Sequence, residues 1–377
     1  MRPLGLDEVY RYEDIQQEIQ YLKNTYPDYV QVYALGKSED GREIDVLQIG
    51  NGPIPIVITA GVHGRETINP IVILKIFENY LQLATLNEPV VVDFDFVNRL
   101  LTHSVGEQGN VRQLFYELSD CTIEHNVANV SPSATPVLVS ENRTEEENLI
   151  EEEKRFQAAI KADNIPMEYD VKVIFDTFTF YVVPLLNPDG YEIALGGFNT
   201  IRNPYYRKQA IASGIPHEEW KDNARGVDIN RNFPSVTWKA KFPGDQPASE
   251  SETRALIQLF AMVPAVGYLD LHSRGKAIYY YKGAMSQAYN HRQKEIADRL
   301  SDVTGYELMP PESEIEELDS GGNTVHYFSE QYHQPAITIE TVLDLEPFPL
   351  DVRHQSTTFR EIFLAPLEFG IAIVESD

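Results

Sequence analysis

The sequence has little of several features that would restrict its fold or its location. It contains 1 cysteine, Cys121, which excludes an intramolecular disulfide framework. Basic residues are few, with 31 Lys and Arg against 58 Asp and Glu, so the net charge of −27 repels nucleic acid backbones and anionic membranes. No apolar run is long enough to span a bilayer, and the N-terminal segment lacks the apolar core of a signal peptide. We therefore expect a soluble cytoplasmic protein that binds neither nucleic acid nor membranes.

The sequence does contain enough apolar residues for one large core, since 42% of its 377 residues are hydrophobic. Strands are expected at residues 30–33, 44–49, 56–60, 178–186, 266–271, 277–281 and 336–339. Helices are expected at residues 12–26, 68–83, 287–303 and 352–374, and another is expected after a capping box formed by Ser249 and Glu252. Strands that alternate with helices predict an α/β fold with a mixed, mainly parallel central sheet flanked by helices.

Residues 101–170 differ from the rest of the chain. They combine polar turns, a stretch with Pro, Ser and Thr, and a charged helix-like run. We interpret them as an insertion beside the main sheet and not as a second core. The chain is thus predicted to be one domain over residues 1–377.

Two metal-capable side chains follow the strand at residues 56–60. The strand runs into Gly61, and His63 and Glu66 come directly after it. Ligand sites of α/β proteins lie at the carboxyl ends of strands, and a catalytic zinc site needs three His or carboxylate ligands. His272 ends another apolar run and supplies a third candidate. These three residues are predicted to bind one metal ion.

Two further segments carry other candidate functional residues. Glu340 ends the apolar run 336–339, where a carboxylate is unusual unless it faces a site, so we expect it to be the general base. Asn230 and Arg231 follow a glycine turn and offer donors suited to a carboxylate.

The segments described above belong to a series of short motifs that extends along most of the chain. In sequence order the motifs are GVHGRE, NPDGY, YYRK, VDINRNF, SESETRAL, LDLHS, SGGN and ITIE. Together they resemble the zinc carboxypeptidases of the carboxypeptidase A type, the M14 family. The resemblance implies that family's fold, one Zn²⁺ per chain and a peptide substrate.

The resemblance also implies roles for the metal-site residues. His63, Glu66 and His272 would hold the zinc, and Glu340 would be the general base. Asp228 would orient His63 without itself binding the metal.

The resemblance implies further roles for residues that contact the substrate. Arg207, in YYRK, would polarise the scissile carbonyl and stabilise its oxyanion. Asn230 and Arg231 would bind the terminal carboxylate. Thr324 lies near the family's specificity position, and its small polar side chain argues against a long pocket for basic residues.

Two positions differ from the digestive enzymes of the family. Glu317 stands where those enzymes have a tyrosine that closes on the substrate, and Arg274 replaces an aromatic residue after His272 and Ser273. Arg274 and the SGGNTVHYF turn make the chain most similar to the γ-D-glutamyl-diamino acid peptidases. Those enzymes cleave between γ-D-glutamate and meso-diaminopimelate or lysine in cell-wall peptides.

Such substrates carry several carboxylates, so Arg274 is predicted to bind an additional one. The alternative is a surface arginine paired with Glu317 or Asp319. Three other functions remain open: a general metallocarboxypeptidase, a zinc deacylase or related amidohydrolase, and a binding module without activity. The sequence leaves open the oligomeric state and the choice between diaminopimelate and lysine. Because the sequence shows no export signal, we expect the protein to act on peptidoglycan peptides during cell-wall turnover or recycling.

Overall fold

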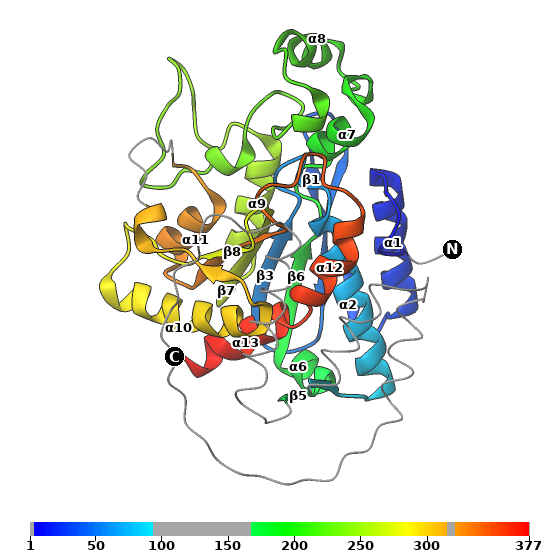
Figure 1. Cartoon of the computed structure of the whole chain (residues 1–377), viewed down its shortest axis with the longest axis vertical. Coiled ribbons are helices and arrows are strands. Elements are labelled where there is room, and N and C mark those ends of the chain that lie inside the picture. The colour runs from blue at the N-terminus through cyan, green and yellow to red at the C-terminus, as the bar shows by residue number, and fades with distance from the viewer. Residues whose placement is uncertain (1–3, 93–166, 315–320, 377) are drawn as a thin grey trace, which may run out of the picture.

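The structure, a computed structural model, describes residues 4–92, 167–314 and 321–376. Its centre is an 8-stranded sheet (Figure 1). In spatial order the strands are β1 (Val30–Lys37), β2 (Glu43–Ile49), β6 (Phe178–Val183), β3 (Ile54–Ala60), β7 (Gly267–Ser273), β10 (Ala336–Thr341), β8 (Ala277–Tyr279) and β9 (Glu307–Leu308). The central strands β6, β3, β7 and β10 are parallel, whereas β1, β2 and β8 run antiparallel to a neighbour. The expected mixed α/β sheet is confirmed.

Helices cover both faces of this sheet. They are α1 (Tyr12–Thr25), α2 (Asn69–Leu86), α6 (Val171–Thr177), α7 (Pro188–Gly196), α8 (Pro204–Ala212), α9 (Ser251–Met262), α10 (Gln287–Thr304), α11 (Thr324–Tyr332), α12 (Arg353–Glu361) and α13 (Ala365–Glu375). Short 3₁₀ turns are η1 (Phe198–Thr200), η2 (His217–Glu219), η3 (Ile229–Arg231) and η4 (Pro311–Glu314), and β4 (Val90–Val92) pairs with β5 (Met167–Tyr169).

The two covered faces explain why the central strands are apolar without alternation. In β3, Ile56 and Ile58 pack into the core under α1, α2 and α13, whereas Val57 between them packs into the core under α9 and α11. Successive side chains of a strand point to opposite faces, so a strand buried on both faces does not alternate between apolar and polar residues. The carboxyl ends of β3, β7 and β10 then meet at one edge of the sheet.

Two sequence-based expectations about helices were wrong. Residues 352–374 form α12 and α13 and not one helix, because Pro366 has no N–H to bond the carbonyl of Ile362 and its ring would clash with that carbonyl. The capping box is also absent: α9 begins at Ser251 with Glu250 at its N-cap, and the Ser249 hydroxyl donates to Glu250 at 2.7 Å.

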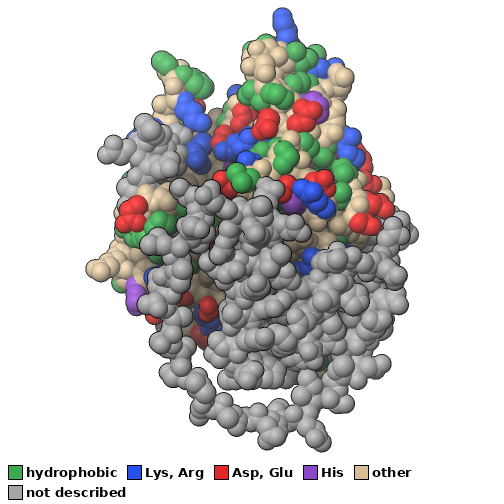
Figure 2. All heavy atoms as spheres, viewed as in Figure 1, with side chains coloured by type: hydrophobic (Ala, Val, Ile, Leu, Met, Phe, Trp, Pro, Cys, Tyr) green, Lys and Arg blue, Asp and Glu red, His purple; other side chains and the backbone are tan. Residues whose placement is uncertain are grey.

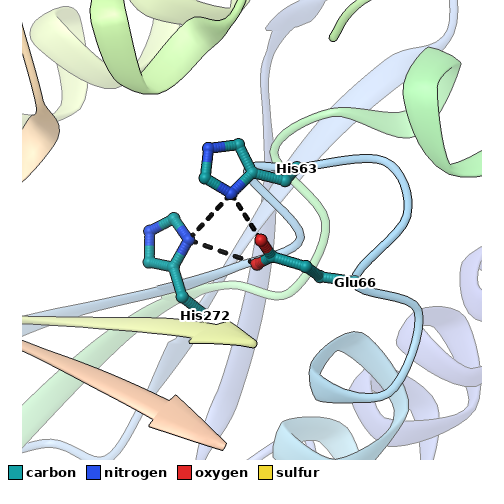
Figure 3. Close-up of side chains that lie close together, drawn as sticks. All are labelled: His63, Glu66 and His272. Atoms are coloured by element: carbon teal, nitrogen blue, oxygen red, sulfur yellow. Dashed lines mark hydrogen bonds and ion pairs between the residues drawn. The ribbon is translucent and has the colours of Figure 1, made fainter. Parts of the chain in front are cut away.

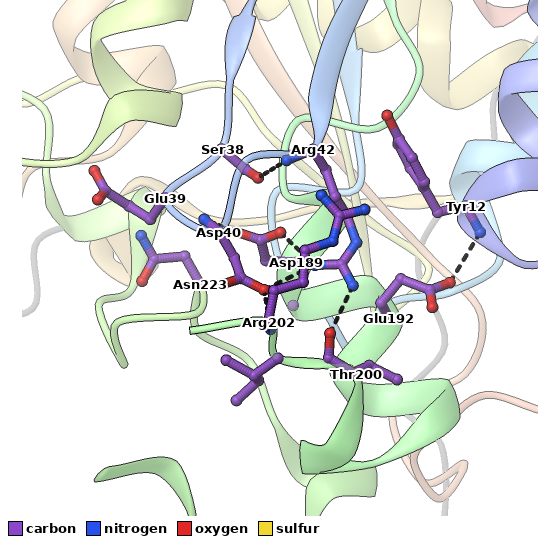
Figure 4. A network of polar contacts seen from close by, with 12 residues as sticks. Tyr12, Ser38, Glu39, Asp40, Arg42, Asp189, Glu192, Thr200, Arg202 and Asn223 are labelled. Atoms are coloured by element: carbon purple, nitrogen blue, oxygen red, sulfur yellow. Dashed lines mark hydrogen bonds and ion pairs between the residues drawn. The ribbon is translucent and has the colours of Figure 1, made fainter. Parts of the chain in front are cut away.

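A buried network of charges joins three segments on one side of the site (Figure 4). Arg42 donates to Asp189 at 2.7 Å and to the carbonyl of Thr200 at 2.8 Å. Asp40 accepts the backbone N–H of Arg202 at 2.5 Å. The network therefore ties the β1–β2 turn to the start of α7 and to the segment that leads into α8.

The interpretation of residues 101–170 as an insertion falls, apart from residues 167–170, outside the described residues. Within the described ranges, no helix has both the length and the apolar character needed to cross a membrane.

Candidate metal centre and catalytic site

His63, Glu66 and His272 converge at the carboxyl edge of the sheet (Figure 3). Nδ1 of His63 lies 2.6 Å from Oε1 of Glu66, and Nδ1 of His272 lies 3.2 Å from Oε2 of the same carboxylate. The two Nδ1 atoms are 3.1 Å apart. All three side chains are buried, and one donor atom from each lies within 4.8 Å of the others. The fold thus brings together the three residues that the sequence predicted to bind one metal ion.

The loop after β3 positions the first two of these residues. Gly61 has a φ of +63°, which favours glycine, and lets the chain leave the strand sharply. At Gly64, a Cβ would lie 2.3 Å from the backbone carbon of Gly190, so only glycine allows this loop to pack against α7. The NPDGY motif thus has a local function: Asn187 caps α7 by accepting the N–H of Gly190 at 2.8 Å.

Each candidate histidine turns its outer nitrogen toward a carboxylate. Nε2 of His63 lies 3.4 Å from Oδ1 of Asp228, an ion-pair distance without good hydrogen-bond geometry. Nε2 of His272 lies 3.0 Å from Oδ2 of Asp270. The sequence reasoning missed Asp270, although its position two residues before His272 in an apolar strand places it on the same face and was a usable signal.

The charges of this cluster shift one another's pKa values. Burial alone would raise the pKa of Glu66, but His63 and His272 outweigh it and lower that pKa. Burial would lower the pKa of His272, but the carboxylates of Asp270 and Glu66 outweigh it and raise that pKa. Two imidazole nitrogens and a carboxylate that face one another in a buried site match the donor set of a catalytic zinc centre. The residues therefore fit a divalent zinc ion.

Glu340 lies beside this cluster. It is the penultimate residue of β10 and the register partner of His272 on β7. Its Oε2 is shielded from solvent and has no hydrogen-bond partner among the described residues. Burial raises the pKa of Glu340 to about 8, and the negative charge of Glu66 adds to the rise.

The residues expected to contact substrate lie on three segments. Asn230 and Arg231 are half-buried in η3, where the N–H of Asn230 donates to Asp228 at 2.9 Å. The Asn230 side-chain oxygen accepts the N–H of Thr324 at 3.0 Å. Arg207 lies on α8, and its guanidinium donates to the carbonyl of Ile201. The predicted oxyanion residue is therefore bonded to the segment before its own helix in this structure.

Thr324 and Arg274 have specific surroundings. The Thr324 side chain is fully buried, and its hydroxyl donates to Asp270. Arg274 donates to the carbonyl of Asp344, and its guanidinium carbon lies 4.6 Å from the ring centre of Phe348. Glu317 and Asp319 lie outside the described residues.

A second arginine reaches the same ring. The guanidinium carbon of Arg65 lies 4.4 Å from the centre of Phe348. Arg65 precedes the candidate ligand Glu66, and Arg274 follows the strand that ends with His272 and Ser273. Basic side chains also gather between the two raised lobes at the top of Figure 2, of which one carries α8. Local positive charge thus occurs on a chain of formal charge −27.

Comparisons with known proteins give consistent relatives. The chain is 27% identical over 190 residues to "Uncharacterized protein YqgT" of Bacillus subtilis (strain 168), which covers 47% of this chain and 48% of the relative. It is 24% identical over 212 residues to "Gamma-D-glutamyl-L-diamino acid endopeptidase 1" of Lysinibacillus sphaericus, which covers 52% of this chain and 50% of the relative. The chain thus spans about half the length of these curated relatives.

A structural neighbour and a family match agree with these sequence relatives. The crystal structure of thrombin activatable fibrinolysis inhibitor superposes with a TM-score of 0.61 at 15% identity, which covers 99% of this chain and 79% of that chain. The sequence profile of the Peptidase_M14 family, described as zinc carboxypeptidase, matches residues 15–95 and 166–341. These matched ranges contain the metal cluster, Asp228 and Glu340. The chain belongs to the zinc carboxypeptidase family.

Proposed function

We propose that the chain is a zinc-dependent peptidase that hydrolyses the γ-D-glutamyl-diamino acid bond of peptidoglycan stem peptides. The observation that carries the proposal is the convergence of His63, Glu66 and His272 beside Glu340, whose Oε2 is shielded from solvent. A binding module would have no need of that fourth residue, since a carboxyl with an unpaired buried oxygen costs stability.

Different residues of the chain would bind the metal and transfer the proton during hydrolysis. Nδ1 of each histidine and the carboxylate of Glu66 would hold the zinc. When bound, the ion supplies a Lewis acid for the scissile carbonyl and favours ionisation of water. Glu340 accepts a proton from the attacking water and passes it to the nitrogen of the leaving amine as the C–N bond breaks. A raised pKa suits a group that must hold this proton, and the charge of a bound cation would return Glu340 to its carboxylate form.

Two other sites would hold the substrate. Asn230 and Arg231 would bind the terminal carboxylate, since an arginine and an amide supply several N–H donors at once. Arg207 would stabilise the oxyanion after its guanidinium exchanges the carbonyl of Ile201 for the substrate.

The choice of a γ-D-glutamyl substrate is supported by the arginines around Phe348. The substrate carries more than one carboxylate, and Arg274 and Arg65 offer cations on the ring of Phe348 beside the candidate metal site. Arg274 is 3.8 Å from the Asp344 carboxylate, which is 79% exposed. An ion pair with an exposed acid is worth about 1 kcal/mol or less, so a substrate carboxylate can displace it. A curated relative also bears the name of such an endopeptidase.

The test is a substrate panel with zinc-loaded protein and mass analysis of the products. It contains γ-D-glutamyl-meso-diaminopimelate and γ-D-glutamyl-lysine peptides, α-linked dipeptides and N-acyl amino acids. Chelator-sensitive cleavage of the γ-linked bond is expected. Preferential release of ordinary C-terminal residues would support a general metallocarboxypeptidase, and cleavage of acyl groups alone would support a deacylase. No chelator-sensitive cleavage with less than one zinc per chain would support a binding module.

A variant of Arg274 tests the substrate preference. Arg274→Ala should lower kcat/KM on the γ-D-glutamyl-diaminopimelate peptide by about tenfold to a hundredfold, the range for loss of a charged hydrogen bond. Its activity on an α-linked dipeptide should change little. Arg254→Ala, an exposed arginine on α9, is the matched control and should change neither rate. Equal losses on both substrates for Arg274→Ala would end the assignment of this arginine to the additional carboxylate.

A further inference from the structure

Asp270 is a fully buried carboxylate whose role is not explained by the metal cluster or the base. It lies on β7 between Tyr268 and His272, which share its face of the strand. Its Oδ1 accepts the hydroxyl of Thr59 at 2.5 Å, and its Oδ2 accepts the hydroxyl of Thr324 and lies 3.0 Å from Nε2 of His272. Three donors from three separate elements therefore converge on one carboxylate.

The donor from His272 decides how its ring faces the metal cluster. If Nε2 carries the proton and donates it to Asp270, the lone pair of Nδ1 points toward Glu66 and His63. A carboxylate that accepts from the outer nitrogen of a metal-binding imidazole fixes its tautomer, its orientation and its basicity. Asp270 thus holds His272 in the orientation that a metal ion requires.

The donor from Thr324 connects this carboxylate to Asn230. We call Asn230 and Arg231, which are expected to bind the terminal carboxylate of the substrate, the clamp. The backbone N–H of the same residue donates to the side chain of Asn230 at 3.0 Å, and the N–H of Asn230 donates to Asp228 at 2.9 Å. Asp228 in turn lies 3.4 Å from Nε2 of His63. A continuous series of polar contacts therefore links the outer nitrogens of both histidines through the first residue of α11.

We propose that Asp270 is a positioning residue that orients His272 toward the metal and, through Thr324, keeps the Asn230 clamp aligned with the metal centre. This inference rests on the proposed function, because it assumes that the cluster binds zinc and that Asn230 binds substrate. It assigns Thr324 to the support of the pocket, since its hydroxyl is already donated to Asp270.

Metal binding measured without substrate tests the first half. Asp270→Asn should raise the zinc dissociation constant by about 10- to 100-fold, measured by competition with a chromophoric chelator. The visible absorption of the Co²⁺-substituted protein should change as well, since the geometry of one ligand changes. If Asp270→Asn does not fold, Asp270→Glu keeps the charge but displaces it, and the same result is expected. Unchanged zinc affinity and an unchanged Co²⁺ spectrum would overturn the positioning role.

A matched pair of threonine variants tests the second half. Thr324→Val and Thr59→Val each remove one hydroxyl from Asp270, and only the first residue also contacts Asn230. Both should weaken zinc binding by about three- to tenfold, the effect of one hydrogen bond. Thr324→Val alone should also raise KM for the γ-D-glutamyl-diaminopimelate peptide, with kcat lowered less. Equal KM values for the two variants would overturn the link to the clamp.

These results separate the inference from the proposed function. If the unaltered protein binds zinc but does not cleave the γ-linked peptide, the substrate assignment fails and the metal-binding results for Asp270 still stand. If the unaltered protein binds no zinc, the proposed function fails, and the positioning role fails with it.

Discussion

His272 and Glu340 are register partners on the adjacent parallel strands β7 and β10. A candidate metal ligand and a candidate proton acceptor are therefore fixed by the backbone hydrogen bonds of the sheet and not by a loop. Sites built on strands are held more accurately than sites on loops, and proton transfer needs that accuracy. The two roles can also be separated by substitution, because each side chain comes from its own strand.

Glu340→Gln should slow hydrolysis strongly without removing the metal. The amide has nearly the same shape as the carboxyl but cannot accept and return a proton, so kcat should fall by about 10²- to 10⁴-fold. Zinc content should stay at that of the unaltered protein, since Glu340 is not one of the three clustered donors. Metal analysis and initial rates on the same preparation measure both effects. A variant that loses zinc together with activity would instead make Glu340 a metal ligand.

Zinc should stabilise the folded protein in a concentration-dependent way. A ligand that binds only the folded state adds about 4 kcal/mol at a thousand times its dissociation constant, so the melting temperature should rise as zinc is added. The metal-free protein should remain folded, because Glu66 already pairs with His63 and His272. Scanning calorimetry with and without a chelator measures the shift.

His63→Ala is the matched control for that experiment. It removes one donor and leaves the sheet intact, so the melting temperature of the variant should not respond to low zinc concentrations. A similar response in both proteins would place the stabilising zinc elsewhere on the chain.

Arg42→Met should destabilise the protein by about 3–5 kcal/mol, because it leaves buried carboxylates without their cation. Arg42 is 5% exposed and bonds Asp189, which is fully buried. Arg353→Met is the control, since that exposed arginine pairs with Glu346 at the surface and should cost about 1 kcal/mol or less. Urea unfolding of both variants gives the comparison. Equal losses would mean that the buried pair contributes no more than a surface pair.

The sequence predicted the strands of the central sheet better than the details that depend on tertiary contacts. The apolar runs that became β3, β7 and β10 were evident because both faces of these strands are buried. His63, Glu66 and His272 were identifiable because each follows or ends such a run. The break between α12 and α13 was missed because helical periodicity continues across it, although Pro366 was a local signal.

Partners distant in sequence were harder to predict. Asp270 receives donors from β3 and from α11, so its role depends on how those elements meet. The contacts of Arg65 and Arg274 with Phe348 likewise join residues far apart in the chain. No local pattern encodes such a contact, and only the packed sheet brings the groups together.

Glu252 should make the stability of the protein fall as the pH rises from about 4.5 to about 8. It is fully buried, and one of its oxygens lies within 4.8 Å of oxygens of Glu39 and Glu250. Burial raises its pKa from 4.5 to about 8, and the charge of Asp189 adds to the rise. Arg225 and Arg254, which contact Glu250 and Glu39, supply positive charge at the edge of this group.

The sign of the effect follows from proton binding. Between the unfolded pKa of 4.5 and the folded pKa of about 8, the folded chain binds more protons at Glu252 than the unfolded chain does. Stability therefore falls as the pH rises through that window, by up to about 1.4 kcal/mol per pH unit for one group. Glu252→Gln is neutral at every pH and should lose this part of the pH dependence.

The measurement compares urea unfolding of the unaltered protein and Glu252→Gln at about pH 6 and about pH 9. The variant should gain stability relative to the unaltered protein at the higher pH, because it avoids a buried charge beside Glu39 and Glu250. Glu13→Gln, an exposed substitution on α1, controls for the loss of one negative charge from an acidic chain and should leave the pH profile parallel to that of the unaltered protein. A parallel profile for Glu252→Gln would mean that this carboxyl is already ionised in the folded state, with Arg225 and Arg254 balancing the charge of the cluster and the Asn223 amide donating a hydrogen bond to Glu252.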